Sequence, residues 1–197
     1  MACSSGYHVI HGNHSRQTEI ERVLVLGVTA ASTFTRDELS SAFATFEQTV
    51  DRAARTQDWD AWVEHYTDDV TYVEHAAGTM HGRDEVRAWI WKTMTVFPGS
   101  YMTSFPSLWT VIDEPTGRVI CELDNPMRDP GDGTIITATN ISIVTYAGDG
   151  KWRRQEDIYN PLRFVKASVK WCRKAKELGT LDEEAAAWFA KFGGPAL

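Results

Sequence analysis

The sequence has little cysteine, and the cysteines it has follow no ligand or disulfide pattern. Its 197 residues include Cys3, Cys121 and Cys172, which are odd in number, far apart and without CxxC spacing. A disulfide framework needs paired cysteines, and a zinc site usually needs closely spaced ones. The cysteines therefore disfavour both, and they predict a reducing compartment, most simply the cytoplasm.

The chain also lacks an excess of positive charge and a long apolar run. It carries 20 lysines and arginines against 27 aspartates and glutamates, which gives a formal net charge of −7. Such a balance argues against nucleic acid as the main partner. No stretch approaches the roughly 18 consecutive apolar residues of a membrane span.

Residues 1–34 give little sign of belonging to the domain that follows them. Their apolar run over 23–31 resembles the core of a short secretory signal. Glu19 and Glu21 stand where such a signal carries positive charge, however, and the segment before the run is long. We therefore predict that residues 1–34 are a disordered extension or precede the true start of the domain, with a secretory signal as the alternative.

Aromatic residues are plentiful, and helical patterns come before strand patterns. Eight Trp, eight Phe and six Tyr can fill a core or line a pocket. A capping box at Thr35–Glu38 opens a first helix, Asp58 can cap a short second one, and 83–97 predicts a third. Strands are predicted over 70–75, 101–112, 118–124, 134–146 and 151–160, with a loop over 125–133. This order predicts an α+β domain over 35–162, with three helices on one face of a curved sheet.

Residues 163–197 predict a C-terminal helical extension. The pattern over 163–178 carries six basic residues against one acid, and a second capping box at Thr180–Glu183 opens another helix. A basic helix could contact anionic lipid or an acidic partner protein. The simpler interpretation is a helix docked by Phe164, Trp171 and other apolar residues, with its lysines in solvent.

Polar residues recur at two-residue spacing on three predicted strands. Residues two apart on a strand point to the same side of the sheet. If these faces converge on a pocket, four carboxylates meet there, and one of them keeps its proton near neutral pH because like charges repel. One raised and one ordinary pKa supply an acid and a base, and a tyrosine can stabilise an oxyanion. The sets that share a face are Tyr72 with Glu74, Glu122 with Asp124, and Gln155 with Asp157 and Tyr159.

Each of these residues also has a structural explanation. Tyr72 could be a packed strand aromatic, Asp124 could form the turn before the 125–133 loop, and Glu122 could bridge to an arginine on a neighbouring strand. The two remaining acids could form ordinary salt bridges. Those pairs would be Glu74 with Arg83 or Arg87, and Asp157 with Arg153 or Arg154.

A metal or an organic cofactor is not predicted. His75 and His81 flank a glycine-containing loop beside Glu74, which are the residue types of a two-histidine, one-carboxylate iron site. Their spacing matches no recognised ligand motif. His65 is expected to be a packing residue that could hydrogen-bond a site carboxylate.

The order of elements and one motif carry a resemblance to a known superfamily. The run YTDDVTYVEH, followed by a Gly-Arg-Asp that opens a helix, resembles the nuclear transport factor 2-like superfamily over about residues 36–165. Within it, the chain is similar to the SnoaL-like polyketide cyclase, ketosteroid isomerase and limonene epoxide hydrolase branches. The resemblance implies a conical α+β barrel that encloses an apolar pocket, and it commonly implies a dimer formed through the convex sheet face.

The same resemblance assigns roles residue by residue. In ketosteroid isomerases the strand after the Asp-Asp pair carries the proton-moving carboxylate, which implies that role for Glu74. Limonene-type epoxide hydrolases carry Tyr and then Asn on this strand, so Tyr72 matches while Glu74 replaces the Asn. Their middle strand has Arg and Asp two apart, where this chain has Glu122 and Asp124. Asp157 matches their water-activating base.

We therefore predict cofactor-free acid–base chemistry on a hydrophobic polyketide-, steroid- or terpenoid-like molecule, of the isomerase, cyclase, dehydratase or epoxide-opening type. Asp157 would be the general base, Glu74 a base or proton shuttle, Asp124 a proton donor, and Tyr72 an oxyanion or water positioner, with Glu122 nearby. The alternative is a non-catalytic binding module or a structural subunit. A homodimer is expected, with a partner protein as a second option at the C-terminal helices. The predicted pocket residues are Phe46, Trp62, Tyr66, Trp89 and Tyr159.

Overall fold

The computed structural model describes residues 33–194. The predicted N-terminal extension, 1–34, therefore lies almost entirely outside the described residues. Three helices come first: α2 (Arg36–Thr56), the short α3 (Asp60–Val63) and α4 (Arg83–Met94). The predicted cap at Thr35 is confirmed, because its hydroxyl accepts from the backbone N–H of Glu38 at 3.2 Å. Asp58 does not cap α3, whose N-cap residue is Trp59.

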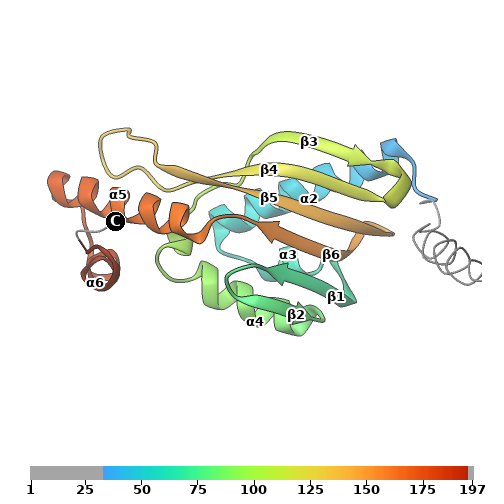
Figure 1. The fold of residues 1–197 in the computed structure, drawn as a ribbon, viewed down its shortest axis with the longest axis horizontal. Helices are drawn as coiled ribbons and strands as arrows, with labels where there is room; N and C mark the ends of the chain where they lie inside the picture. The colour runs from blue at the N-terminus through green and yellow to red at the C-terminus, as the bar shows by residue number, and fades with distance from the viewer. Residues whose placement is uncertain (1–32, 195–197) are drawn as a thin grey trace, which may run out of the picture. The chain divides into compact units, whose positions relative to one another are not determined.

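Six strands form one mixed sheet (Figure 1). Along the sheet the order is β2-β1-β6-β5-β4-β3; β1 pairs with β6 in parallel, and the other pairs are antiparallel. The predicted α+β class is thus confirmed, and the sheet is mixed. Pro106 directly precedes the edge strand β3, a position that suits a residue without a backbone N–H to donate. The strands are β1 (Tyr66–Glu74), β2 (Gly78–His81), β3 (Ser107–Asp113), β4 (Arg118–Pro126), β5 (Thr137–Gly148) and β6 (Lys151–Ile158).

Two predicted loops contain strand residues. The segment after Glu74 turns back as β2, a four-residue edge strand that is too short to be predicted from alternation. The strand predicted over 118–124 continues to Pro126, where it still pairs with Thr137 of β5. This extension matters because it places Asn125 in the sheet rather than in a loop.

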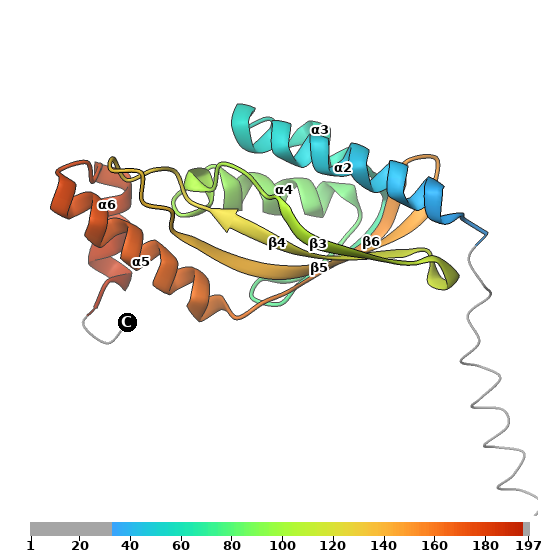
Figure 2. The same cartoon turned by 90° about the horizontal axis from the view of Figure 1, so that it is seen from above.

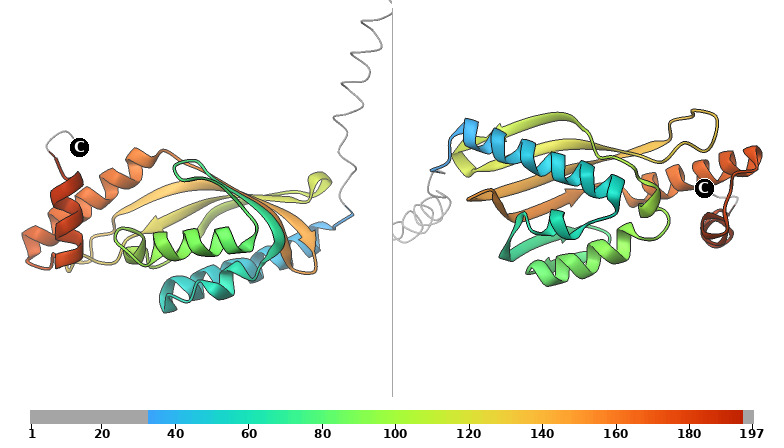
Figure 3. Two further views of the ribbon diagram at one scale, coloured as in Figure 1. Left: turned by 90° about the horizontal axis from the view of Figure 1, so that it is seen from below. Right: turned by 180° about the vertical axis from the view of Figure 1, so that it is seen from behind.

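The three helices cover one face of the sheet (Figures 2 and 3). Trp152 of β6 is fully buried, and its ring meets Phe43 and Phe46 of α2 at centroid distances of 6.2 and 5.8 Å. Burial of each such aromatic contributes about 1.5–3 kcal/mol and fixes the helix layer against the strands. We call the helix-covered side of the sheet the inner face, and the opposite side the outer face.

The C-terminal segment forms α5 (Pro161–Leu178) and α6 (Glu183–Phe192), which lie beyond one end of the sheet (Figure 2). The predicted cap at Thr180 is wrong: Asp182 caps α6 by accepting from the N–H of Ala185, while the Thr180 hydroxyl donates to the Pro130 carbonyl. Trp171 of α5 is buried in a second apolar core with Phe97 and Tyr101. The helix is therefore docked by its apolar face. None of the helices described in residues 33–194 is long and apolar enough to cross a membrane.

Candidate active site

A cavity of about 440 Å³ opens between the helices and the inner face of the sheet. Its wall is mostly aromatic and aliphatic. Polar side chains reach it from the strands, from Glu47 of α2, from Thr93 of α4 and from Tyr159 just after β6. Four of the five predicted pocket residues line it, namely Phe46, Trp62, Trp89 and Tyr159. Tyr66, the fifth, is buried behind the wall, where its hydroxyl donates to Gln155 Oε1 at 2.5 Å. An apolar cavity with a few polar groups is the usual form of a small-molecule site.

Asp157 is the centre of the polar part of the wall. Its Oδ1 accepts from the Ser142 hydroxyl at 2.5 Å, and its Oδ2 accepts from the Tyr72 hydroxyl. Gln155 Nε2 lies 3.1 and 3.3 Å from the two carboxylate oxygens and donates to Tyr72 Oη at 3.1 Å. These three side chains lie on neighbouring strands, because β6 pairs with β1 on one side and β5 on the other. The register alone thus assembles the group.

A second chain of hydrogen bonds reaches Asp157 along the inner face, from strands β4 and β5. Asn125 Nδ2 donates to Asn140 Oδ1 at 2.9 Å, and Asn140 Nδ2 donates to Ser142 Oγ at 2.9 Å. All three residues are buried and line the cavity. Sequence reasoning missed them. The available signal was the spacing of Asn140 and Ser142, two apart on a predicted strand, which is the spacing used to select the acids.

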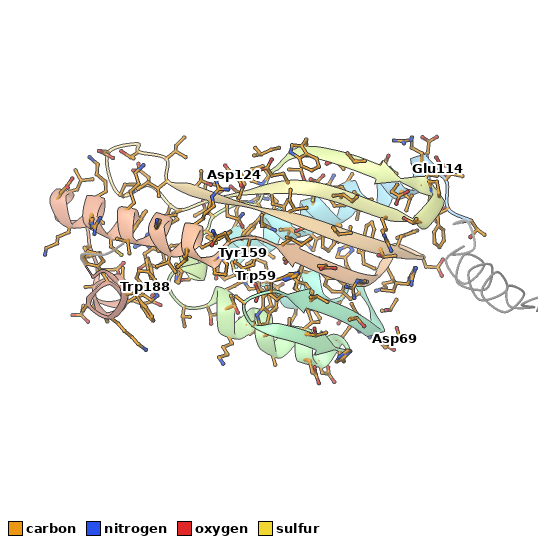
Figure 4. All side chains as sticks on the ribbon, viewed as in Figure 1. Trp59, Asp69, Glu114, Asp124, Tyr159 and Trp188 are labelled. Carbon is orange, nitrogen blue, oxygen red and sulfur yellow. The ribbon has the colours of Figure 1, made fainter. Side chains whose placement is uncertain are left out.

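Glu74 forms a separate polar group at the end of β1. Tyr159 donates its hydroxyl to Oε1, and the backbone N–H groups of Ala76 and Ala77 donate to Oε2, at 3.0 Å from Ala76. Glu74 is 5% exposed and also lines the cavity. Its carboxylate therefore holds the β1–β2 turn and contacts the cavity at the same time. Figure 4 shows Tyr159 where β6 runs into α5.

Burial is the main electrostatic influence on these groups. It raises the pKa of Asp157 above its ordinary value, and the nearby charge of Glu74 adds to this, while the donors Ser142, Tyr72 and Gln155 act in the opposite direction. Burial likewise raises the pKa of Tyr72 and of Tyr159, and each is raised further by its carboxylate partner. Both tyrosines therefore remain neutral hydrogen-bond donors at physiological pH.

The salt-bridge alternatives for the two acids are wrong. Arg83 pairs with Glu64 at 2.5 Å and with Asp68, and Arg154 pairs with Glu156 at 2.8 Å. Arg87 pairs with Asp60, Glu64 and Asp84, and Arg153 donates to the Tyr146 carbonyl. Among the described residues, no lysine, arginine or histidine lines the cavity. Asp157 and Glu74 thus face an apolar space without a cation to neutralise them.

Glu122 and Asp124 do not join the site, which corrects the expectation that four carboxylates converge. They share a face of β4, as predicted, but it is the outer face, because Cys121, Leu123 and Asn125 line the cavity. Glu122 accepts from the Trp109 indole N–H at 2.6 Å rather than from an arginine. Asp124 accepts from the Thr137 hydroxyl and from the N–H of Asn125. Figure 4 shows Asp124 toward the far end of β4.

The histidines are placed apart from the cavity. His75 pairs with Glu156 at 3.0 Å on the outer face, and the backbone N–H of His81 donates to Glu85. His65 is a half-buried packing residue, as predicted: its ring lies 5.7 Å from that of Phe46, and its Nε2 lies 2.9 Å from the Thr49 hydroxyl rather than beside a site carboxylate. Within residues 33–194, no three His, Cys, Asp or Glu side chains gather in a way that could hold a metal ion.

Comparisons with solved structures agree with this fold. A candidate isomerase from Bacillus subtilis is 16% identical, with a TM-score of 0.53 over 68% of this chain and 95% of that one. A candidate SnoaL-like polyketide cyclase from Jannaschia sp. CCS1 is 14% identical, with a TM-score of 0.51 over 66% and 90%. TerC, co-crystallised with polyporic acid, is 20% identical, with a TM-score of 0.50 over 64% and 97%. At these identities the likeness shows the fold alone.

Sequence comparison places the chain in a family. Among curated proteins, none matches it significantly. The family model of the SnoaL-like domain matches residues 46–155, which is more than half of the chain and includes β1, the middle strands and the start of the Gln155–Asp157 segment. This protein therefore belongs to the SnoaL-like domain family of the nuclear transport factor 2-like superfamily.

Proposed function

We propose that the protein is a cofactor-free enzyme that moves protons on a hydrophobic small molecule, in a reaction of the isomerase or cyclase type. One observation carries the proposal: Asp157 lies in the wall of an apolar cavity without a cationic partner, with two hydroxyl donors on its oxygens. Burial makes this carboxylate a stronger base than an ordinary aspartate, although the two hydroxyl donors act in the opposite direction. Names of fold relatives, a candidate isomerase and a candidate polyketide cyclase, agree with this class.

The proposed step begins at a carbon next to a carbonyl group. Asp157 takes the proton from that carbon, and the electron pair moves to the carbonyl oxygen to give an enolate. Protonation of Asp157 weakens its bond from Tyr72, so the Tyr72 hydroxyl becomes free to donate to the enolate oxygen. Return of the proton to a different atom completes an isomerisation. Attack of the enolate on a second carbonyl, with Asp157 protonating the new alkoxide, completes a ring closure.

Glu74 is proposed as a positioning residue and secondary proton acceptor. Its hydrogen bond from Tyr159 places that hydroxyl at the cavity wall, and its charge raises the pKa of Asp157. Dehydration and epoxide opening remain members of the proposed class, but the lack of an arginine among the described lining residues favours enolate chemistry. Asp124 and Glu122 drop out of the proposal because they face away from the cavity.

The test uses 2-tetralone, an apolar bicyclic ketone, and follows exchange of its α-protons for deuterium by NMR. Wild-type protein should accelerate the exchange above the buffer rate, and Asp157→Asn should lower the protein-catalysed rate about 10²–10⁴-fold. Glu156→Gln is the matched control, because it removes a carboxylate from the same strand on the outer face. Exchange that is no faster with the wild type than with Asp157→Asn would contradict the proposal.

A binding module without catalysis is the second candidate. It is favoured by the number of donors already bound to Asp157, namely Ser142, Tyr72 and Gln155, since a fully bonded carboxylate is a weaker base. The exchange assay separates the two, because a binding module would hold 2-tetralone without exchanging its protons. A structural-subunit role would instead appear as copurification with a second polypeptide, and the C-terminal helices are the proposed contact.

We also propose a cytoplasmic homodimer. Cys121 and Cys172 are free and buried, which suits a reducing compartment. On the outer face, Trp109, Val111 and Ile158 are 44%, 52% and 42% exposed, and such an apolar surface suits a second copy of the chain. Size-exclusion chromatography with light scattering should give a dimer mass for the wild type and a monomer mass for Val111→Glu. A monomeric wild type would refute this part.

A further inference from the structure

The side-chain amide of Asn125 is held in one orientation. Its Nδ2 donates to three oxygens: the Leu123 carbonyl at 3.3 Å, the Ala138 carbonyl at 3.0 Å and Asn140 Oδ1 at 2.9 Å. A flipped amide would turn an acceptor oxygen toward these acceptors, so the contacts fix nitrogen and oxygen unambiguously. The Asn125 Oδ1 atom must therefore point away from all three.

That oxygen has no donor among the residues the structure describes. Asn125 is 5% exposed, and it lines the cavity. Within the described residues, the oxygen is not one of the fully enclosed side-chain atoms left without a partner, so it is open to the cavity, where a donor on a bound molecule can reach it. The neighbouring groups on β4 and β5 are acceptors that the Asn125 nitrogen already contacts. The natural donor to the Asn125 oxygen is therefore a group on a molecule in the cavity.

Asn125 lies well away from Asp157, yet in a fixed relation to it. It pairs with Ala138, whereas Asp157 pairs with Ser142 four residues along β5, roughly 13 Å at about 3.3 Å per residue. The hydrogen-bond chain through Asn140 and Ser142 links the two groups inside the cavity. Three bonds and two side chains put their polar atoms on the order of 10 Å apart.

We propose that Asn125 is a substrate-positioning residue that accepts a hydrogen bond from a hydroxyl group remote from the reacting carbon. The substrate class that this site recognises is an elongated, largely apolar ring compound with a hydroxyl at the end opposite Asp157. The inference rests on the proposed function, since it takes the same cavity as the substrate site. It adds the specificity element, because an analogue without the hydroxyl leaves the Asn125 oxygen unpaired.

The experiment measures binding rather than turnover, with two rigid biphenyls that differ in one hydroxyl. Isothermal titration gives the affinity of the wild type for 4,4′-dihydroxybiphenyl and for 4-phenylphenol. The expected preference for the dihydroxy compound is about fivefold or more, as for one neutral hydrogen bond. Asn125→Leu, a near-isosteric change, should reduce that ratio to about one while leaving the affinity for 4-phenylphenol within about twofold.

Thr139→Val is the matched control, since Thr139 neighbours Asn140 on β5 but pairs with Asp124 on the outer face. It should keep the wild-type ratio, which separates recognition from a general disturbance of β4 and β5. The wild-type ratio is decisive even if Asn125→Leu does not fold. Equal affinities for the two biphenyls overturn the inference alone and leave the exchange assay to judge the proposed function. Failure of both to bind overturns the inference together with the substrate site.

Discussion

Replacing Asp157 by asparagine should separate catalysis from stability. Asparagine has nearly the same shape and keeps one acceptor oxygen, and either the Ser142 or the Tyr72 hydroxyl can turn to accept from the new amide N–H. The hydrogen-bond group therefore stays intact while the base is lost. We expect α-proton exchange of 2-tetralone to fall about 10²–10⁴-fold, the range for removal of a general base.

The same substitution should raise the free energy of unfolding at neutral pH. Burial raises the pKa of Asp157, so between its ordinary and its raised value the folded state binds more protons than the unfolded state. Wild-type stability then falls as pH rises through that window, by at most about 1.4 kcal/mol per pH unit for one group. Asparagine carries no such proton. The difference in free energy of unfolding between the variant and the wild type should therefore grow in favour of the variant from about pH 4 upward, and level off above the raised pKa of Asp157.

Urea unfolding of the wild type and Asp157→Asn over about pH 4 to 8, with NMR exchange on the same samples, measures both effects. Glu156→Gln again controls for the loss of a carboxylate; the pKa of Glu156 is lowered by its contacts with His75 and Arg154. Replacing Glu156 by glutamine should therefore lower the free energy of unfolding above the ordinary glutamate pKa, which is the opposite of the effect expected for Asp157→Asn. If Asp157→Asn lost stability relative to wild type as pH rose, the assignment of Asp157 as a buried, unpaired carboxylate would be refuted.

Three further changes test the surroundings of Asp157 and the C-terminal core. Tyr72→Phe removes a donor to the Asp157 carboxylate, which should raise the pKa of Asp157. The rise of the exchange rate with pH should therefore move to higher pH, and the plateau should be about 10²–10³-fold lower because the oxyanion donor is lost. A rise at the wild-type pH would argue against Tyr72 as a partner of the base. Glu74→Gln removes a charge that raises the pKa of Asp157, so the rise of the exchange rate with pH should move to lower pH in the same measurement. Trp171→Ala, at a residue 1% exposed, should cost about 3–5 kcal/mol in urea unfolding. Trp91→Ala, at a residue 37% exposed, should cost far less, and equal losses would mean that the second core does not stabilise the domain.

Local sequence patterns correctly predicted the start of the first helix and the side chains that share a strand face. The Thr35 capping box started a helix where expected, because a hydroxyl that accepts from the third N–H needs no tertiary partner. The two-residue repeat correctly placed Tyr72 with Glu74, and Gln155 with Asp157 and Tyr159, on one face each. The superfamily resemblance supplied the cone fold, and it is now supported by the match over residues 46–155.

The failures concern choices that the local sequence leaves open. Glu122 and Asp124 share a face, but a strand has two equivalent faces until its neighbours pair with it, and the β4–β5 register turned both acids outward. The same register turned Asn125 inward, although its Asn-Pro composition predicts a loop. Strand parity, the Thr35 cap and the apolar character of the pocket were therefore determined by the sequence itself. Which side chains meet around Asp157 was decided only by tertiary structure, because the groups that bond to it come from strands separated by up to 85 residues and are brought together by sheet pairing.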